Sequence, residues 1–92
     1  MNLPIQVTER DILNGSCNSP YSCAIALAAN RALKGHSRII YCDVLMKTIR
    51  FYDGSGDLVC AVKLSKSAKN FVRAYDAGLL VRPFTMQVKL PC

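Results

Sequence analysis

Apolar and polar residues alternate in several short stretches of this chain, a pattern typical of strands that bury one face. The segment 53–57, Asp-Gly-Ser-Gly-Asp, separates two of these stretches by a length typical of a β-hairpin loop. The pattern predicts strands over residues 3–7, 37–43, 47–52, 58–64 and 84–90.

Helix signals lie between the strand-like stretches. Thr8 is placed to cap a short helical turn that ends at Asn14-Gly15. A longer helix is predicted over residues 20–34, with Ser19 as its cap and Pro20 at its first position. Another is predicted from a cap at Ser65 or Ser67 to about Ala77, where Gly78 supplies a left-handed stop.

These elements follow the order β-α-β-β-β-α-β, with the turn at Thr8 left out of the count. We therefore expect one small α+β domain over residues 1–92, with a mostly antiparallel sheet and two helices packed on one face of it.

Composition narrows the class of protein. Of the 92 residues, 51% are apolar and 20% are charged, which is too hydrophobic for a disordered chain. No apolar run reaches the roughly 20 residues of a membrane span, and no secretory signal is recognisable. We expect a protein of the cytoplasm with no membrane partner.

The five cysteines are odd in number and lack the close pairs of a zinc site. We expect reduced thiols, no metal and no cofactor. Cys42 and Cys60 lie in strand-like runs and are expected to pack as small apolar side chains, whereas Cys92 is expected to be exposed.

The net charge of +6 gathers first on the predicted helix after residue 65. Apolar residues recur there at the spacing of one buried face, at Ala68, Phe71, Val72 and Tyr75. Lys66, Lys69 and Arg73 point the opposite way, beside Asn70. This basic stripe favours an anionic partner, and the alternative is an ordinary solvated helix face.

Strand parity places a second basic set on one sheet face. Arg50, Lys63 and Lys89 are predicted to lie there with Tyr52, Thr48, Thr85 and Gln87. A basic sheet with an aromatic residue is typical of single-stranded nucleic-acid platforms, although any half-exposed antiparallel sheet alternates in this way. The chain has an extra strand and lacks the Gly-aromatic motif of an RNA-recognition motif.

No catalytic constellation is recognisable in the sequence. The single histidine, His36, follows Gly35 at a helix exit and is expected to be a turn residue. The carboxylates Asp43, Asp53, Asp57 and Asp76 occur singly, so no general acid and base pair is indicated. We expect no enzyme and no small-molecule substrate.

Four segments carry a resemblance: Thr8–Gly15, Cys23–Ala28, Phe71–Gly78 and Val81–Pro91. Together they resemble small proteins encoded by bacteriophages and actinobacterial genomes, with Ala24 where proline is usual. Size, charge and this phage-like pattern suggest an anti-CRISPR protein, a non-enzymatic inhibitor in the host cytoplasm that blocks target DNA recognition.

The partner implied is a host RNA-guided surveillance complex of type I, together with its guide RNA. The contact candidates would be Lys66, Lys69, Arg73, Arg50, Lys63 and Lys89. The alternative is a phage accessory protein that binds DNA or RNA directly through a basic sheet or helix face.

Overall fold

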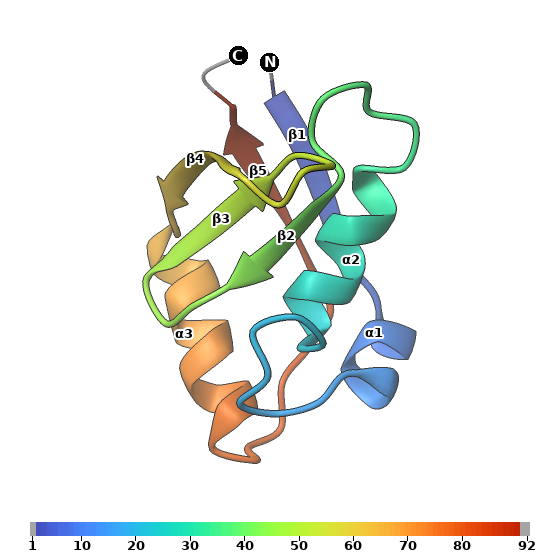
Figure 1. Cartoon of the computed structure of the whole chain (residues 1–92). Coiled ribbons are helices and arrows are strands. Elements are labelled where there is room, and N and C mark those ends of the chain that lie inside the picture. Colours follow the sequence, from blue (N-terminus) through green and yellow to red (C-terminus); the bar gives the residue numbers. More distant parts are fainter. Residues whose placement is uncertain (1, 91–92) are drawn as a thin grey trace.

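In the computed structural model, which describes residues 2–90, the strands form two antiparallel sheets (Figure 1). One sheet pairs β1 (Asn2–Val7) with β5 (Phe84–Lys89). The other has the order β2 (Tyr41–Val44), β3 (Thr48–Tyr52) and β4 (Leu58–Lys63). The helices within this range are α1 (Glu9–Asn14), α2 (Ala24–Ala32) and α3 (Lys66–Asp76).

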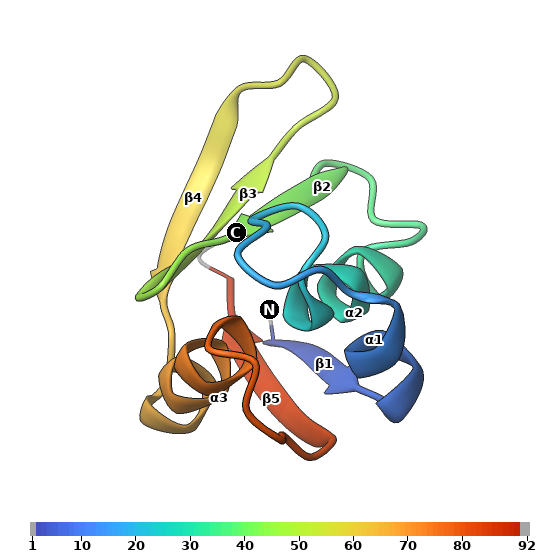
Figure 2. The same cartoon turned by 90° about the horizontal axis from the view of Figure 1, so that it is seen from below.

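The two sheets lie on opposite sides of the core, with α2 and α3 flanking it (Figure 2). Alternate residues of β1 are buried, and their partners in β5 are buried with them: Leu3 opposite Val88, and Ile5 opposite Met86. The three-stranded sheet contributes Cys42, Val44, Ile49 and Phe51 to the same core. One continuous core therefore holds both sheets together.

The α+β class, the single domain and the antiparallel pairing are confirmed. The order of the elements is also as predicted, but the strands form two sheets instead of one, because β5 pairs with β1 and the other strands pair among themselves. β5 pairs with the strand that is farthest from it in sequence, and alternation within a strand does not specify its partner.

The first long helix begins at Ala24, four residues later than expected, with Cys23 as its N-cap. The Pro20 carbonyl accepts a hydrogen bond of 2.8 Å from the Val44 amide of β2 instead of a bond within a helix. The Ser19 carbonyl accepts from the Cys23 amide at 3.0 Å, in a turn that precedes the helix. The helix ends at Ala32, with Leu33 as its C-cap.

The second predicted strand begins at Tyr41 instead of residue 37. His36 causes the delay, because its Nδ1 accepts from the amides of Arg38 at 3.1 Å and of Ile39 at 3.0 Å. The predicted turn role of His36 is therefore confirmed. The hairpin loop at 53–57 is also confirmed, with the Asp53 carboxylate accepting from the amides of Ser55 and Asp57.

Helix α3 matches the prediction closely. Ser65 caps it through a 3.2 Å hydrogen bond from the Ala68 amide to Ser65 Oγ, and Gly78 has the left-handed φ of 75° that follows such helices. Its predicted buried face, Ala68, Phe71, Val72 and Tyr75, is buried. Cys42 is buried as expected and Cys60 packs partly buried against the core, whereas Cys92 lies outside the described residues.

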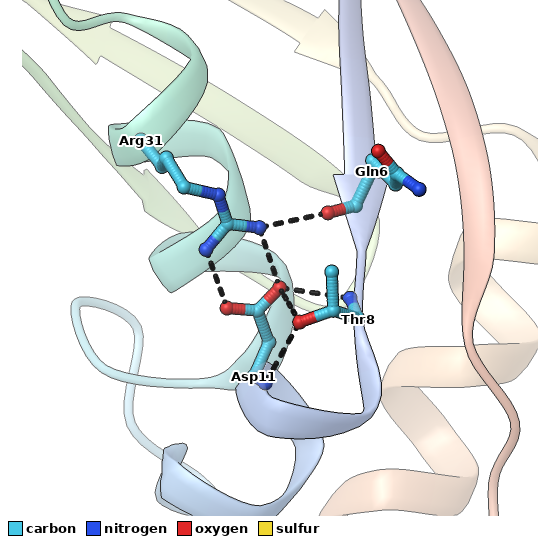
Figure 3. A network of polar contacts seen from close by, with 4 residues as sticks. All are labelled: Gln6, Thr8, Asp11 and Arg31. Atoms are coloured by element: carbon cyan, nitrogen blue, oxygen red, sulfur yellow. Dashed lines mark hydrogen bonds and ion pairs between the residues drawn. The ribbon is translucent and has the colours of Figure 1, made fainter.

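A buried carboxylate joins β1, α1 and α2 (Figure 3). Asp11 accepts from the backbone amide and hydroxyl of Thr8, and the Thr8 hydroxyl accepts from the Asp11 amide, which makes a capping box. Arg31 from α2 donates to both Asp11 oxygens at 2.8 Å and to the Gln6 carbonyl at 2.9 Å. One guanidinium thus fixes the relative positions of three elements.

Gly15 allows a close approach of backbone and side chains at the end of α1. A Cβ at this position would lie 2.6 Å from Tyr75 Oη, 2.8 Å from the Ala24 nitrogen and 2.8 Å from the Asp11 carbonyl oxygen. Two of these three atoms belong to the backbone and cannot move without displacing the helices that contain them. Only glycine fits between α1, α2 and α3 at this point.

We predict that Gly15→Ala lowers the free energy of unfolding by about 1–3 kcal/mol, because the added methyl group overpacks this contact. Gly54→Ala is the matched control, since the atom nearest to its new Cβ is a side-chain carbon of Ile40 at 3.7 Å. The control should change stability by less than about 0.5 kcal/mol. Urea denaturation of both variants checks this, and equal stabilities would contradict the close approach.

We also predict a pH dependence from Asp11. The Arg31 hydrogen bonds lower its pKa from 3.8 to about 2, against the opposing effect of burial. Because the pKa is lower in the folded state, the network stabilises the protein above about pH 4 and loses this contribution as the pH falls toward about 2.

The measurement is the free energy of unfolding of the wild type and of Asp11→Asn at several pH values. The difference in free energy of unfolding between the wild type and Asp11→Asn should shrink by about 1–2 kcal/mol between about pH 5 and pH 2. This energy is smaller than the full pKa shift would give, because Arg31 is exposed to solvent. Asp57→Asn, an exposed loop substitution, should show no such change. An advantage of the wild type that does not vary with pH would contradict the network.

Candidate functional site

The basic residues predicted on one face of α3 line a hollow of about 400 Å³. Lys66 and Arg73 are exposed, Lys69 is half-buried, and Asn70 lies among them as expected. The structure adds Lys47 and Met46 from the turn between β2 and β3. We call this hollow, lined by Met46, Lys47, Lys66, Lys69, Asn70 and Arg73, the basic hollow.

No acidic residue lines the basic hollow. Within residues 2–90, the ion pairs are Arg31 with Asp11 and Arg50 with Asp43, so the four cations of the hollow are not neutralised by a carboxylate. Like charges placed together without counterions attract a polyanion and raise its association rate.

Short backbone hydrogen bonds hold the Lys47 side of the hollow beside α3. The Leu64 amide donates to the Lys47 carbonyl at 2.9 Å, one residue before the cap Ser65. The Leu45 amide donates to the Thr48 carbonyl at 2.8 Å and closes the β2–β3 turn. Figure 1 shows this turn beside α3. Lys47 was not predicted as a site residue, because the sequence placed it at the start of the strand over residues 47–52, whereas β3 begins at Thr48 and leaves Lys47 in the turn.

A second hollow of about 260 Å³ continues the first along α3. Met46 and Arg73 line both. Its other lining residues are Asn18, Ser19, Pro20, Cys23, Val44, Leu45, Val72 and Asp76. We call this second space the apolar hollow, since aliphatic side chains form much of its wall.

The loop at the far end of the apolar hollow is fixed to the C-terminal turn of α3. The Asn18 amide donates to Asp76 Oδ1 at 2.8 Å, and Asn18 Nδ2 donates to the Asp76 carbonyl at 3.3 Å. The Cys17 thiol donates to the Tyr75 carbonyl at 3.0 Å. Asn18 has a φ of 58°, a conformation that asparagine tolerates better than most residues. The wall of the hollow is therefore held in place without a ligand.

The structure does not assemble the predicted sheet platform. Arg50 and Lys63 belong to the three-stranded sheet, but Lys89, Thr85 and Gln87 lie in the other sheet. Arg50 and Lys63 do share one face, because Lys63 pairs with Thr48, two residues before Arg50. Placing Lys89 on that face was wrong, because β5 belongs to the other sheet.

Arg50 is also committed to a structural contact. Its Nε and Nη2 donate to the two carboxylate oxygens of Asp43 at 2.9 and 2.6 Å, and the Tyr52 hydroxyl donates to Asp43 at 3.1 Å. Asp43 is 1% exposed, and its hydrogen bonds raise the pKa of Arg50 further. The Tyr52 ring stacks on Tyr41 with centroids 5.0 Å apart, so one of its faces is covered.

The buried cysteine thiols and the possibility of a metal site are the other candidates for chemistry. Burial raises the pKa of the Cys42 thiol to about 12 and also raises that of Cys23, so both thiols stay protonated near neutral pH. Within residues 2–90, no three His, Cys, Asp or Glu residues come close enough to hold a metal ion. The two hollows beside α3 are thus the candidate site.

The chain matches no protein-family model, and neither a curated protein nor a solved structure is significantly similar to it. Among residues 2–90, no helix combines the length and the apolar character that are needed to cross a membrane.

We predict that Arg50→Ala destabilises the fold more than Lys63→Ala does. The first substitution leaves the buried Asp43 without its bidentate partner, whereas Lys63 is exposed and makes no ion pair with any residue of the described range 2–90. Thermal unfolding of both variants checks this. Equal melting temperatures of the two variants would contradict the structural role of Arg50 and leave its side chain a candidate for contact with a partner.

Proposed function

We propose that this protein is a non-catalytic binding protein that recognises the phosphate backbone of a nucleic acid through the basic hollow. The observation that carries the proposal is the presence of four cations in one hollow with no acidic residue in its lining. Phosphate contacts from Lys and Arg supply most of the affinity of sequence-independent nucleic-acid binding.

The types of side chain support a backbone contact. Three of the four cations are lysines, whose flexible stems and compact charges suit phosphates that vary in position. Their placement along one face of α3 and on the facing turn gives the hollow two basic walls. Lys66 is the first residue of α3, so the positive end of the helix dipole lies beside it and favours an anion there.

A narrower form of the proposal concerns the biological partner. The guide RNA of an RNA-guided surveillance complex carries the same phosphate backbone, and the resemblance to phage-encoded proteins favours such a complex, of type I, in the host cytoplasm. A protein of net charge +6 is repelled by the basic groove that awaits target DNA, so guide RNA and acidic subunit surfaces are the expected contacts. Binding there would block target DNA recognition.

We predict that replacing Lys66, Lys69 and Arg73 together by Glu abolishes nucleic-acid binding without unfolding the protein. For four phosphate contacts, the wild-type affinity for a single strand should fall with a log–log salt slope of about −3. Fluorescence anisotropy with a labelled oligonucleotide at several salt concentrations measures both quantities.

The matched control replaces Lys34, Arg82 and Lys89 by Glu. These exposed residues lie outside both hollows, and the variant has the same net charge as the test variant. The control should keep most of the salt slope and bind far more tightly than the test variant. Equal losses in the two variants would show that overall charge, not the basic hollow, drives binding.

The narrower form is tested by capture of tagged protein from a bacterial lysate that contains a type I effector complex, with and without nuclease. A stoichiometric effector complex that survives nuclease, and that the Lys66, Lys69 and Arg73 variant fails to capture, supports the inhibitor. Free nucleic acid that is lost after nuclease and high salt supports direct binding instead. If the tagged protein captures neither an effector complex nor nucleic acid, both the narrower and the general form of the proposal are contradicted.

A further inference from the structure

The two hollows lie next to each other along α3, and we call them together the groove; one is basic and the other is largely apolar. Met46 and Arg73 line both hollows and mark the place where they meet. One wall is α3, from Lys66 to Asp76. The other is made by the turn between β2 and β3, continued by the loop that contains Asn18, Ser19 and Pro20. A ligand that fills the groove must carry two different groups.

The charges fix the direction in which such a ligand lies. Lys47, Lys66 and Lys69 line only the basic hollow, and Arg73 lies at the junction. Asp76, the acidic residue of the groove, lines only the apolar hollow and repels an anion from that end. An anionic group therefore belongs near Lys66, and an uncharged group belongs beside Val72.

We propose that the groove binds one nucleotide of a single strand, with its base in the apolar hollow and the adjoining phosphate in the basic hollow. This inference rests on the proposed function and adds selectivity for unpaired bases. Hollows of about 260 and 400 Å³ that adjoin each other fall together within the size range of small-ligand sites.

The lining of the apolar hollow fits a base. Leu45 and Met46 present aliphatic surface to the flat face of a ring, and Val44 and Val72, which are 5% and 6% exposed, line the same hollow. Polar groups of Asn18, Ser19 and Asp76 lie among them, where the edge of a base can form hydrogen bonds. The bases of a duplex are stacked and paired, so a duplex offers the groove phosphates without a base.

The apolar hollow is preorganised. The loop that forms its end is held by the hydrogen bonds of Asn18 to Asp76, and the Pro20 carbonyl accepts from the Val44 amide at 2.8 Å. Binding therefore needs little ordering of the backbone, which lowers the entropy lost on association. Met46 is 65% exposed and is free to close over a bound base.

The test compares three labelled probes by fluorescence anisotropy: a short oligothymidylate, an abasic strand of the same length and charge, and a duplex of the same length. We expect the oligothymidylate to bind about fivefold more tightly than the abasic strand, no more than the lower end of what stacking on aromatic side chains contributes, because the apolar side chains of this hollow are not aromatic. Equal binding of these two strands overturns this inference but leaves the phosphate-binding function standing. Binding of none of the probes overturns both.

A pair of matched variants locates the base. Ser19→Phe places a ring in the apolar hollow and should remove the advantage of the oligothymidylate while leaving the affinity for the abasic strand unchanged. Ser67→Phe adds the same ring outside both hollows and should keep that advantage. Loss of the advantage in both variants, or in neither, contradicts the placement.

Methyl NMR of the wild-type protein gives a readout that does not depend on variants. Thymidine monophosphate should shift the methyl signals of Val44, Leu45 and Val72 through the ring current of its base. Deoxyribose 5-phosphate, which carries the same phosphate without a base, should leave these signals in place. Identical responses to the two probes overturn the inference.

Discussion

The hydrogen bond from the Tyr75 hydroxyl to the Ile12 carbonyl, 2.9 Å long, connects the last turn of α3 to α1. Burial raises the pKa of Tyr75, so its hydroxyl remains a donor at physiological pH. The carbonyl oxygen of Tyr75 accepts a hydrogen bond from the Cys17 thiol, and its ring stacks on that of Phe71 with centroids 5.7 Å apart. Tyr75 thereby positions the loop that ends the groove and ties that loop to the core.

Local signals in the sequence were sufficient for α3, the hairpin loop at 53–57 and the alternation of β1 and β3. Ser65, Gly78 and the i, i+3, i+4 spacing act within a few residues of the helix that they define. The start of α2 depends instead on the Val44 amide, because the Pro20 carbonyl accepts a hydrogen bond from it and not from an amide within the helix. Sheet membership likewise depends on partners distant in sequence, so Lys89 was placed beside Arg50 and Lys63 in error.

The candidate site shows the same division between local and distant information. Helical periodicity placed Lys66, Lys69 and Arg73 together, and the structure keeps them together. Periodicity could not add Lys47, nor show that Arg50 binds a buried carboxylate. The roles also follow the chemistry of the side chains: Arg31 and Arg50 make bidentate contacts inside the fold, whereas lysines supply most of the charge of the groove.

The pairing of β1 with β5 has a consequence for biosynthesis. Asn2 pairs with Lys89 across nearly the whole described chain, so the ribosome synthesises the apolar face of β1 long before its partner exists. Leu3, Ile5 and Val7 remain without their strand partner until β5 is made. Completion of the core is therefore delayed until β5 has been synthesised, and the nascent chain exposes the apolar face of β1 during that interval.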